Sequence, residues 1–155
     1  MKNKLIIVTD LGRLKAYRSE LTPKHTPRLE LLEEVYWAEA HRKFDDWVTD
    51  TAGRRAGPSH PGWGAPIADD HNLKLENERR LIRRISRHIE DLVQRTGQGG
   101  VWLAAQKEID HRILDQFPQS IRAQIEKNLP SDLVKADPMQ VLEAFLKTEQ
   151  KEAYA

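Results

Sequence analysis

The chain contains 155 residues, of which 39% are hydrophobic and 32% are charged, and its net charge is only +1. This length suits one domain, and the hydrophobic fraction, which includes four tryptophans, argues against an intrinsically disordered chain. The sequence has no cysteine, which excludes disulfides, thiolate-bound zinc and cysteine nucleophiles.

The N-terminal residues predict a β-hairpin. Residues 4–9 form a short apolar run rich in β-branched side chains, which is typical of a buried strand. Asp10 and Gly12 supply turn chemistry, and residues 13–18 then alternate between apolar and polar side chains. Because the first run is too short for a signal peptide or a membrane span, we expect a cytoplasmic protein without membrane association.

A third strand and a long loop follow the hairpin. Residues 28–37 alternate with a period of two, which favours a strand, although a helix over residues 29–41 is also compatible with them. Residues 49–72 are rich in glycine and proline and poor in apolar side chains. We predict a mobile loop there, because long segments of this kind inside compact domains are usually functional or mobile.

The clearest pattern in the chain predicts an amphipathic helix over residues 75–95. Apolar side chains recur there at the i, i+3 and i+4 spacing that places them on one helix face. These apolar residues are Leu81, Ile82, Ile85, Ile89, Leu92 and Val93. Gly97 and the glycines that follow it are typical of a helix C-terminus.

The C-terminal half predicts alternating strands and helices. Residues 101–105 are expected to form a short apolar strand, and residues 106–116 and 118–126 are expected to form two helices. Residues 128–135 contain a proline and are compatible with either a strand or a loop.

A last helix is predicted to begin at Asp137 and Pro138, which suit the N-cap and the first helical position. Its predicted buried stripe consists of Met139, Leu142, Phe145 and Leu146. The residues from 147 onwards are polar, so we assign one domain to residues 1–148 and a polar C-terminal tail to residues 149–155. The order of elements predicts an α/β fold in which helices pack on a mixed sheet.

The predicted long helix carries a dense run of cations. Its basic residues are Arg79, Arg80, Arg83, Arg84 and Arg87, with His88 beside them. They form stripes at i, i+4 and i+8, and guanidinium groups suit bidentate binding of phosphates and stacking on bases. Two interpretations stay open: a surface that binds RNA or another anion, or a face that is solvated or paired with Glu30, Glu33 and Glu34.

The glycine-rich loop offers further candidates for RNA binding. Arg54 and Arg55 follow Gly53, and Trp63 lies between Gly62 and Gly64. A tryptophan in this setting either stacks on a base or a partner surface, or folds back onto the core.

The sequence gives little support for a metal site or a catalytic site. Asp69, Asp70 and His71 are metal-capable and His60 lies on the same loop, but their spacing does not match a paired ligand set. We interpret Asp10 as a turn residue rather than as the first carboxylate of a two-metal nuclease. The sequence also contains no Ser-His-Asp signature, P-loop or dinucleotide fingerprint. We therefore predict no catalytic residue, no metal and no cofactor.

Nearly the whole chain resembles a family of bacterial proteins required for attachment to host cells. The resemblance includes the opening hairpin at residues 5–17, then the Gly/Arg-rich loop and the helix at residues 76–93. It continues through residues 101–105 and from residues 121–129 to the helix that begins at Asp137. This family is similar in turn to the middle domain of archaeal and eukaryotic peptide-chain release factors. The resemblance implies a mixed sheet with RNase H-like strand order.

In the release factors, a Gly-Gly-Gln tripeptide lies before the long helix and assists the attack of water on the peptidyl-tRNA ester. The corresponding loop here, residues 51–72, contains no Gly-Gly-Gln, so no catalytic residue is carried over. We therefore expect a non-catalytic protein that binds RNA or the ribosome. The alternatives are a metal-dependent nuclease or hydrolase that uses Asp10 and the loop histidines, and a protein-interaction module for attachment or signalling.

Overall fold

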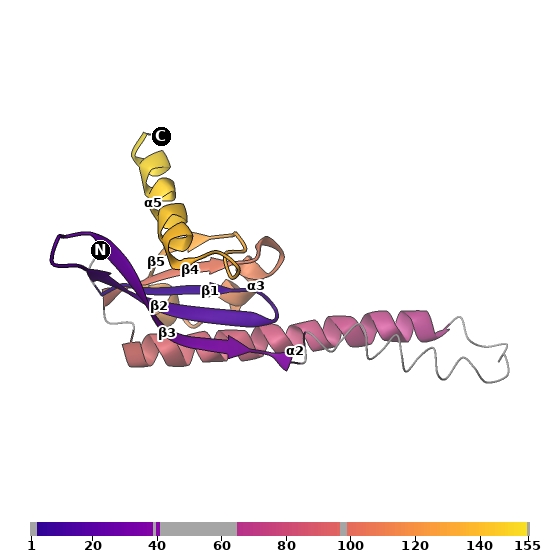
Figure 1. Cartoon of the computed structure of the whole chain (residues 1–155). Coiled ribbons are helices and arrows are strands. Elements are labelled where there is room, and N and C mark those ends of the chain that lie inside the picture. Colours follow the sequence, from indigo (N-terminus) through magenta and orange to yellow (C-terminus); the bar gives the residue numbers. More distant parts are fainter. Residues whose placement is uncertain (1–2, 39, 41–64, 97–98, 155) are drawn as a thin grey trace.

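The computed structural model describes residues 3–38, 40, 65–96 and 99–154, and the side chains of residues 65–71 and 149–154 lie outside that description. Figure 1 shows one mixed sheet with helices around it. The elements are β1 (Leu5–Thr9), β2 (Arg13–Leu21), β3 (Pro27–Tyr36), α2 (Ala65–Thr96), β4 (Val101–Ala105), α3 (Lys107–Gln116), α4 (Gln119–Arg122), β5 (Ile125–Leu129) and α5 (Pro138–Tyr154). Across these described segments, no helix has the length and apolar character needed to cross a membrane.

The five strands lie side by side in the order β3-β2-β1-β4-β5. β1 and β2 are antiparallel, from Leu5 opposite Arg18 to Thr9 opposite Leu14, and β2 and β3 are antiparallel as well. β1 pairs in parallel with β4, and β4 pairs in parallel with β5. The predicted α/β fold with a mixed sheet is therefore confirmed, and the third predicted element is a strand rather than a helix. The RNase H-like assignment stays a prediction.

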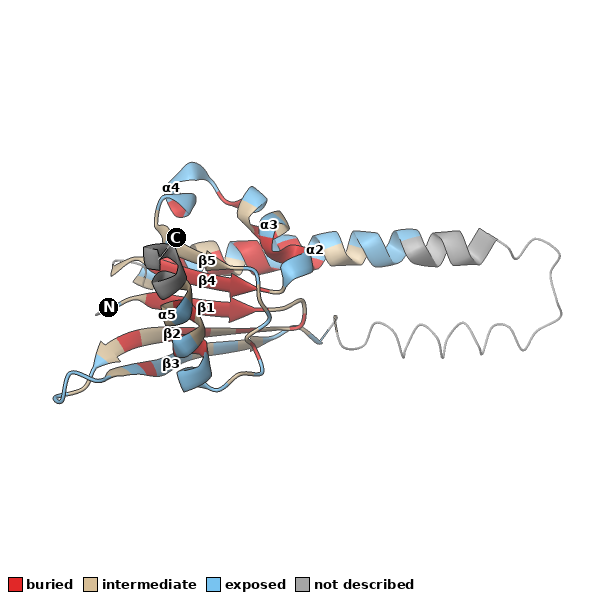
Figure 2. Ribbon diagram, turned by 90° about the horizontal axis from the view of Figure 1, so that it is seen from above, coloured by how far each residue is buried: buried red, intermediate tan, exposed pale blue. Residues whose placement is uncertain are grey.

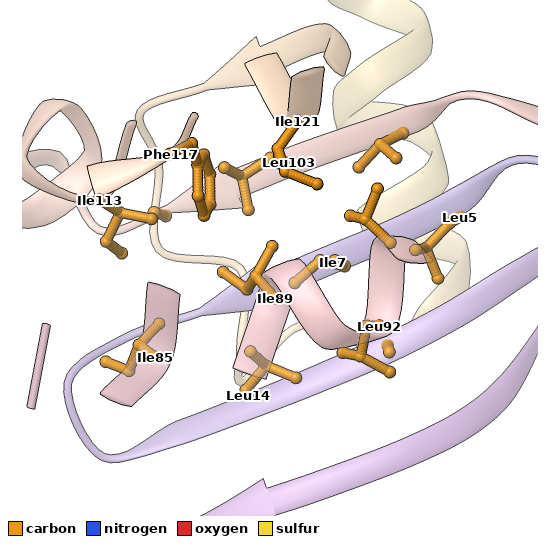
Figure 3. Packing of buried hydrophobic residues seen from close by; sticks show 14 of the residues in the cluster. Leu5, Ile7, Leu14, Ile85, Ile89, Leu92, Leu103, Ile113, Phe117 and Ile121 are labelled. Atoms are coloured by element: carbon orange, nitrogen blue, oxygen red, sulfur yellow. The ribbon is translucent and has the colours of Figure 1, made fainter. Parts of the chain in front are cut away.

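Helices cover both faces of the sheet, which explains why β1 and β4 are buried along their whole length. Leu5 and Ile7 of β1 belong to a core shared with α2 and α3, whereas Ile6 and Val8 belong to a second core shared with α5. This division follows from the alternation of side chains along a strand. Figure 3 shows the first core, where side chains from α2, β1 and β4 point toward one another.

α2 confirms the strongest sequence prediction and extends it. All of the apolar residues predicted for its inner face are buried. The helix begins at Ala65 instead of residue 75, so the predicted loop is wrong over residues 65–72, and residues 49–64 lie outside the described chain. Pro66 does not prevent this start, because the first helical N–H groups have no intrahelical acceptor to lose. Figure 2 shows that α2 continues beyond the sheet, and residues 72–76 in this part of the helix are exposed.

The structure corrects the region between α3 and α5. α4 ends at Arg122, so the helix predicted over residues 118–126 is wrong in its second half. The following strand, β5, begins before the segment at residues 128–135 that was expected to be a strand or a loop. β5 pairs in parallel with β4, beginning with Ile125 opposite Val101. This tertiary pairing outweighs the local preference for helix.

α5 begins at the predicted residue, and its N-terminus is a capping box. Asp137 Oδ1 accepts a hydrogen bond from the Gln140 backbone N–H at 2.9 Å, and Gln140 Oε1 accepts one from the Asp137 N–H at 3.1 Å. Phe145 is buried as predicted, but Met139 is 52% exposed, so its assignment to the buried stripe was wrong. Val141 and Phe145 lie one turn apart on the inner face, which turns Met139 outward. The helical backbone continues into the predicted C-terminal tail.

Candidate functional site

The predicted arginines lie together on the solvent side of α2. The five exposed positions between residues 79 and 87 are all arginine, and we call them the arginine face: Arg79, Arg80, Arg83, Arg84 and Arg87. Successive residues of a helix are about 100° apart, so these positions cover the arc opposite the buried apolar stripe. The packing of that stripe against the sheet therefore fixes the direction of the arginine face.

Two acidic residues of β3, Glu33 and Glu34, contact basic residues outside the arginine face. Glu33 Oε2 is 3.3 Å from His88 Nε2 and 3.7 Å from Arg95 Nη2. Glu34 Oε1 is 3.5 Å from Arg13 Nε. Within the described part of the chain, no ion pair involves Arg79, Arg80, Arg83 or Arg87. Within the described residues, these four arginines are therefore left for an external anion.

A hollow of about 290 Å³ lies between the arginine face and α3, and we call it the α2–α3 hollow. Arg79 and Arg83 line it from α2, and Arg112 lines it from α3. Two carboxylates lie nearby: Asp115 lines the hollow, and Glu78 Oε2 is 3.7 Å from Arg112 Nη1. Because the three guanidinium groups outnumber these carboxylates, the hollow attracts anions such as phosphate groups.

A second hollow, of about 390 Å³, lies on the opposite side of the arginine face, between α2 and β3. We call it the β3–α2 hollow. Its lining includes Arg84 and Arg87 together with the rings of Trp37 and His88. The two ring centroids are 6.1 Å apart and the rings are nearly perpendicular, at 88°. This side of the arginine face therefore combines positive charge with aromatic surface.

The sequence did not identify Arg112 or Trp37 as site residues. Arg112 lies on a predicted helix, but only the packing of α3 against α2 brings it to the same hollow as Arg79. Trp37 follows the last residue of β3, and nothing in its local pattern indicates that α2 passes beside it. The loop candidates Arg54, Arg55 and Trp63 lie outside the described residues, so their placement relative to α2 stays a prediction.

Asp10 has the turn role that the sequence predicted. Its Oδ1 atom accepts hydrogen bonds from the backbone N–H groups of Gly12 and Arg13, both at 2.7 Å. These bonds close the turn between β1 and β2. A search of the described residues finds no group of three or more His, Asp or Glu side chains that could hold a metal ion. His60 and the side chain of His71 lie outside that part of the chain.

Asp110 is the one carboxylate that is buried among the described residues, with 5% of its surface exposed. It lies in the first turn of α3, and its Oδ1 atom accepts a hydrogen bond from Asn128 Nδ2 of β5 at 2.8 Å. Burial raises the pKa of the Asp110 carboxyl, and the Asn128 hydrogen bond and the nearby His111 only partly oppose this effect. The contact ties β5 to α3, which is a structural role.

Replacing Asp110 by asparagine should raise the free energy of unfolding at neutral pH. The folded state holds the Asp110 proton more tightly than the unfolded state does, so wild-type stability falls as pH rises above the ordinary aspartate pKa of 3.8. Glu126 acts in the opposite direction, because the Lys4 hydrogen bond lowers its pKa. Urea denaturation of the wild type and the Asp110→Asn variant at several pH values measures the two free energies of unfolding. Glu126 is present in both proteins, so its contribution drops out of their difference. The gain in the free energy of unfolding should become smaller toward acid pH. A gain of equal size at every pH would mean that the buried charge of Asp110 does not cause it.

A comparison with known families covers most of the chain. A family model described as "Protein required for attachment to host cells" matches residues 5–144, which extend from β1 into α5 and contain the whole sheet. A search of the curated proteins finds no match to the chain. The matched length leaves only the two ends of the sequence outside the family model, so this chain belongs to the family of proteins required for attachment to host cells.

Proposed function

We propose that this protein binds RNA, free or within the ribosome, through the arginine face of α2, and that it catalyses no reaction on the RNA. The observation that supports this proposal is a set of four exposed arginines, Arg79, Arg80, Arg83 and Arg87, that form no ion pair within the described residues. Like charges at i and i+4 cost a few tenths of a kcal/mol per pair. An external polyanion would relieve this repulsion.

The arrangement of the arginine face suits an extended phosphate backbone. Arg79, Arg83 and Arg87 follow one another at i and i+4, so each is about 6 Å further along the helix axis. Arg112 adds a fourth guanidinium group from α3 at the α2–α3 hollow. Several contacts in a row suit a chain of phosphates better than a single small anion. The resemblance to release-factor middle domains favours RNA as that chain.

The first test is a salt series with the purified protein and a labelled single-stranded RNA. Each phosphate contact to a single strand contributes about 0.7 to the slope of log affinity against log salt concentration. Four arginine contacts should therefore give a slope of about −3 between roughly 50 and 200 mM salt. The same series with purified ribosomes tests whether ribosomal RNA is bound. Absence of binding at the lowest salt concentration in both series would overturn the proposal.

A protein-interaction module is the second candidate function, and one observation favours it. β3 forms an edge of the sheet and carries three exposed apolar side chains, Leu31, Leu32 and Tyr36. An exposed edge strand with apolar residues is able to pair with another chain. Association through it would depend little on salt, so the salt series separates the two candidates. The described residues provide no comparable observation for a metal-dependent nuclease.

A further inference from the structure

We infer that the β3–α2 hollow receives an unpaired nucleobase, so that the RNA bound along the arginine face is single-stranded at that point. This inference rests on the proposed RNA binding and specifies which form of RNA is preferred. It depends on four observations: two aromatic side chains that contact each other, cations beside them, a shallow hollow that is open to solvent, and its position next to the arginine face.

Both aromatic side chains of the hollow contact other parts of the protein. The Trp37 backbone N–H donates a hydrogen bond to the Gly12 carbonyl at 2.8 Å, and the indole packs against the core formed with α2 and α3. His88 Nε2 lies 3.3 Å from Glu33 Oε2, and its ring meets Trp37 edge to face. Rings that are held in this way lose little conformational entropy when a base stacks on them.

The charges around the hollow favour an anionic ligand with an uncharged planar part. Arg84 and Arg87 line the hollow and belong to the arginine face. Asp91 also lines it, but its Oδ2 atom accepts from Arg95 Nε at 2.9 Å and lies 2.8 Å from Arg95 Nη2, so its charge is already balanced. A nucleotide matches this pattern, because its base is aromatic and neutral and its phosphate is negative.

The shape of the hollow gives a base access to the rings. Its space of about 390 Å³ is shallow and open to solvent, so an unpaired base is able to reach it from the surface. Bases within a duplex are already stacked on each other and their faces are not accessible, whereas unpaired bases are free to stack on aromatic side chains. A duplex would still contact the arginine face through its phosphates. The hollow should therefore create a preference for single strands and leave duplex binding unaffected.

The test compares single-stranded and hairpin-duplex RNA of equal length in three proteins: wild type, Trp37→Leu and Trp37→Phe. Stacking on an aromatic side chain contributes enough that removing it should weaken single-strand binding by about tenfold. Trp37→Leu should show this loss for the single strand and keep the wild-type affinity for the duplex. Trp37→Phe, the matched control, retains a ring and should keep most of the preference. Thermal unfolding of each variant checks that the fold is intact.

Each outcome of this test has a distinct meaning. Equal binding of single strand and duplex by the wild type, unchanged in Trp37→Leu, would overturn the base site and leave the proposed RNA binding intact. Failure of the wild type to bind either RNA at low salt would overturn both. If Trp37→Leu does not fold, ultraviolet crosslinking of wild-type protein to 4-thiouridine RNA replaces it. Crosslinks at Trp37 or His88 would support the base site, and crosslinks confined to other residues would overturn it.

Discussion

Replacing Arg83 and Arg87 together by glutamate should weaken RNA binding by about 10- to 100-fold near 0.1 M salt. The salt slope should also become shallower by about 1.4, because two phosphate contacts of about 0.7 each are lost. Both side chains are exposed and neither forms an ion pair within the described residues, so their replacement removes no ion pair there. The measurement is the same salt series, performed in parallel on the variant and the wild type.

Loss of folding does not explain the expected loss of binding by this variant. Glutamate at residue 83 would lie at i+4 from Arg79 with opposite charge, which favours the helix, whereas glutamate at residue 87 would lie at i−4 from Asp91 with like charge, which disfavours it by a similar few tenths of a kcal/mol. Because these effects oppose each other, the thermal unfolding temperature should change little. A fall in the unfolding temperature together with a loss of binding would show that the arginines stabilise the fold instead.

A matched control separates a local contact from an effect of net charge. Lys24 and Lys135 are exposed and lie outside α2, in the β2–β3 turn and in the segment before α5. Replacing both by glutamate changes the net charge by the same amount as the double arginine variant. Binding by this control should fall only slightly. An equal loss in the two double variants would mean that general electrostatic attraction, and not the arginine face, accounts for binding.

Replacing Phe145 by alanine should lower the free energy of unfolding by about 3–5 kcal/mol. Phe145 is fully buried in the second core, and its ring centroid lies 5.5 Å from that of Trp102 on β4. The substitution removes apolar surface and leaves a cavity between α5 and the sheet. Since the free energy of unfolding of a whole domain is only about 5–15 kcal/mol, this loss would be a large part of it. Urea denaturation followed by circular dichroism measures it.

Met139→Ala is the control for this prediction, because the same helix carries both residues. Met139 is 52% exposed, so its replacement should change the free energy of unfolding by no more than about 0.5 kcal/mol. Comparison of the two variants also tests which residues of α5 are buried, because the sequence predicted that Met139 is buried and the structure shows it exposed. Similar losses in the two variants would mean that α5 presents a different face to the sheet.

Much of the fold was predictable from local patterns. Three patterns indicate how a segment buries its apolar side chains: the continuous apolar run in β1, the alternation along β2 and β3, and the apolar stripe of α2. The position of Asp137 predicted the start of α5, because a carboxylate followed by proline suits a helix N-terminus. In each case the deciding interactions lie within a few residues along the chain.

Several errors and omissions occurred where distant residues decide the structure. β5 became a strand because β4 offers a parallel partner, which local propensity does not reveal. The N-terminal end of α2 was missed for a different reason. Residues 65–72 follow a glycine- and proline-rich stretch and lie before the predicted apolar stripe, so periodicity gave no helix signal there.

Some features of the candidate site follow from the local sequence, and others arise only from the tertiary structure. The sequence by itself determined that five arginines share one face of α2, because helical spacing depends only on residue number. Only the tertiary structure decided that this face points to solvent, that β3 leaves most of it unpaired, and that Arg112 and Trp37 flank it. These features arise when the apolar stripe of α2 packs against the sheet, which brings together residues that are far apart in the chain.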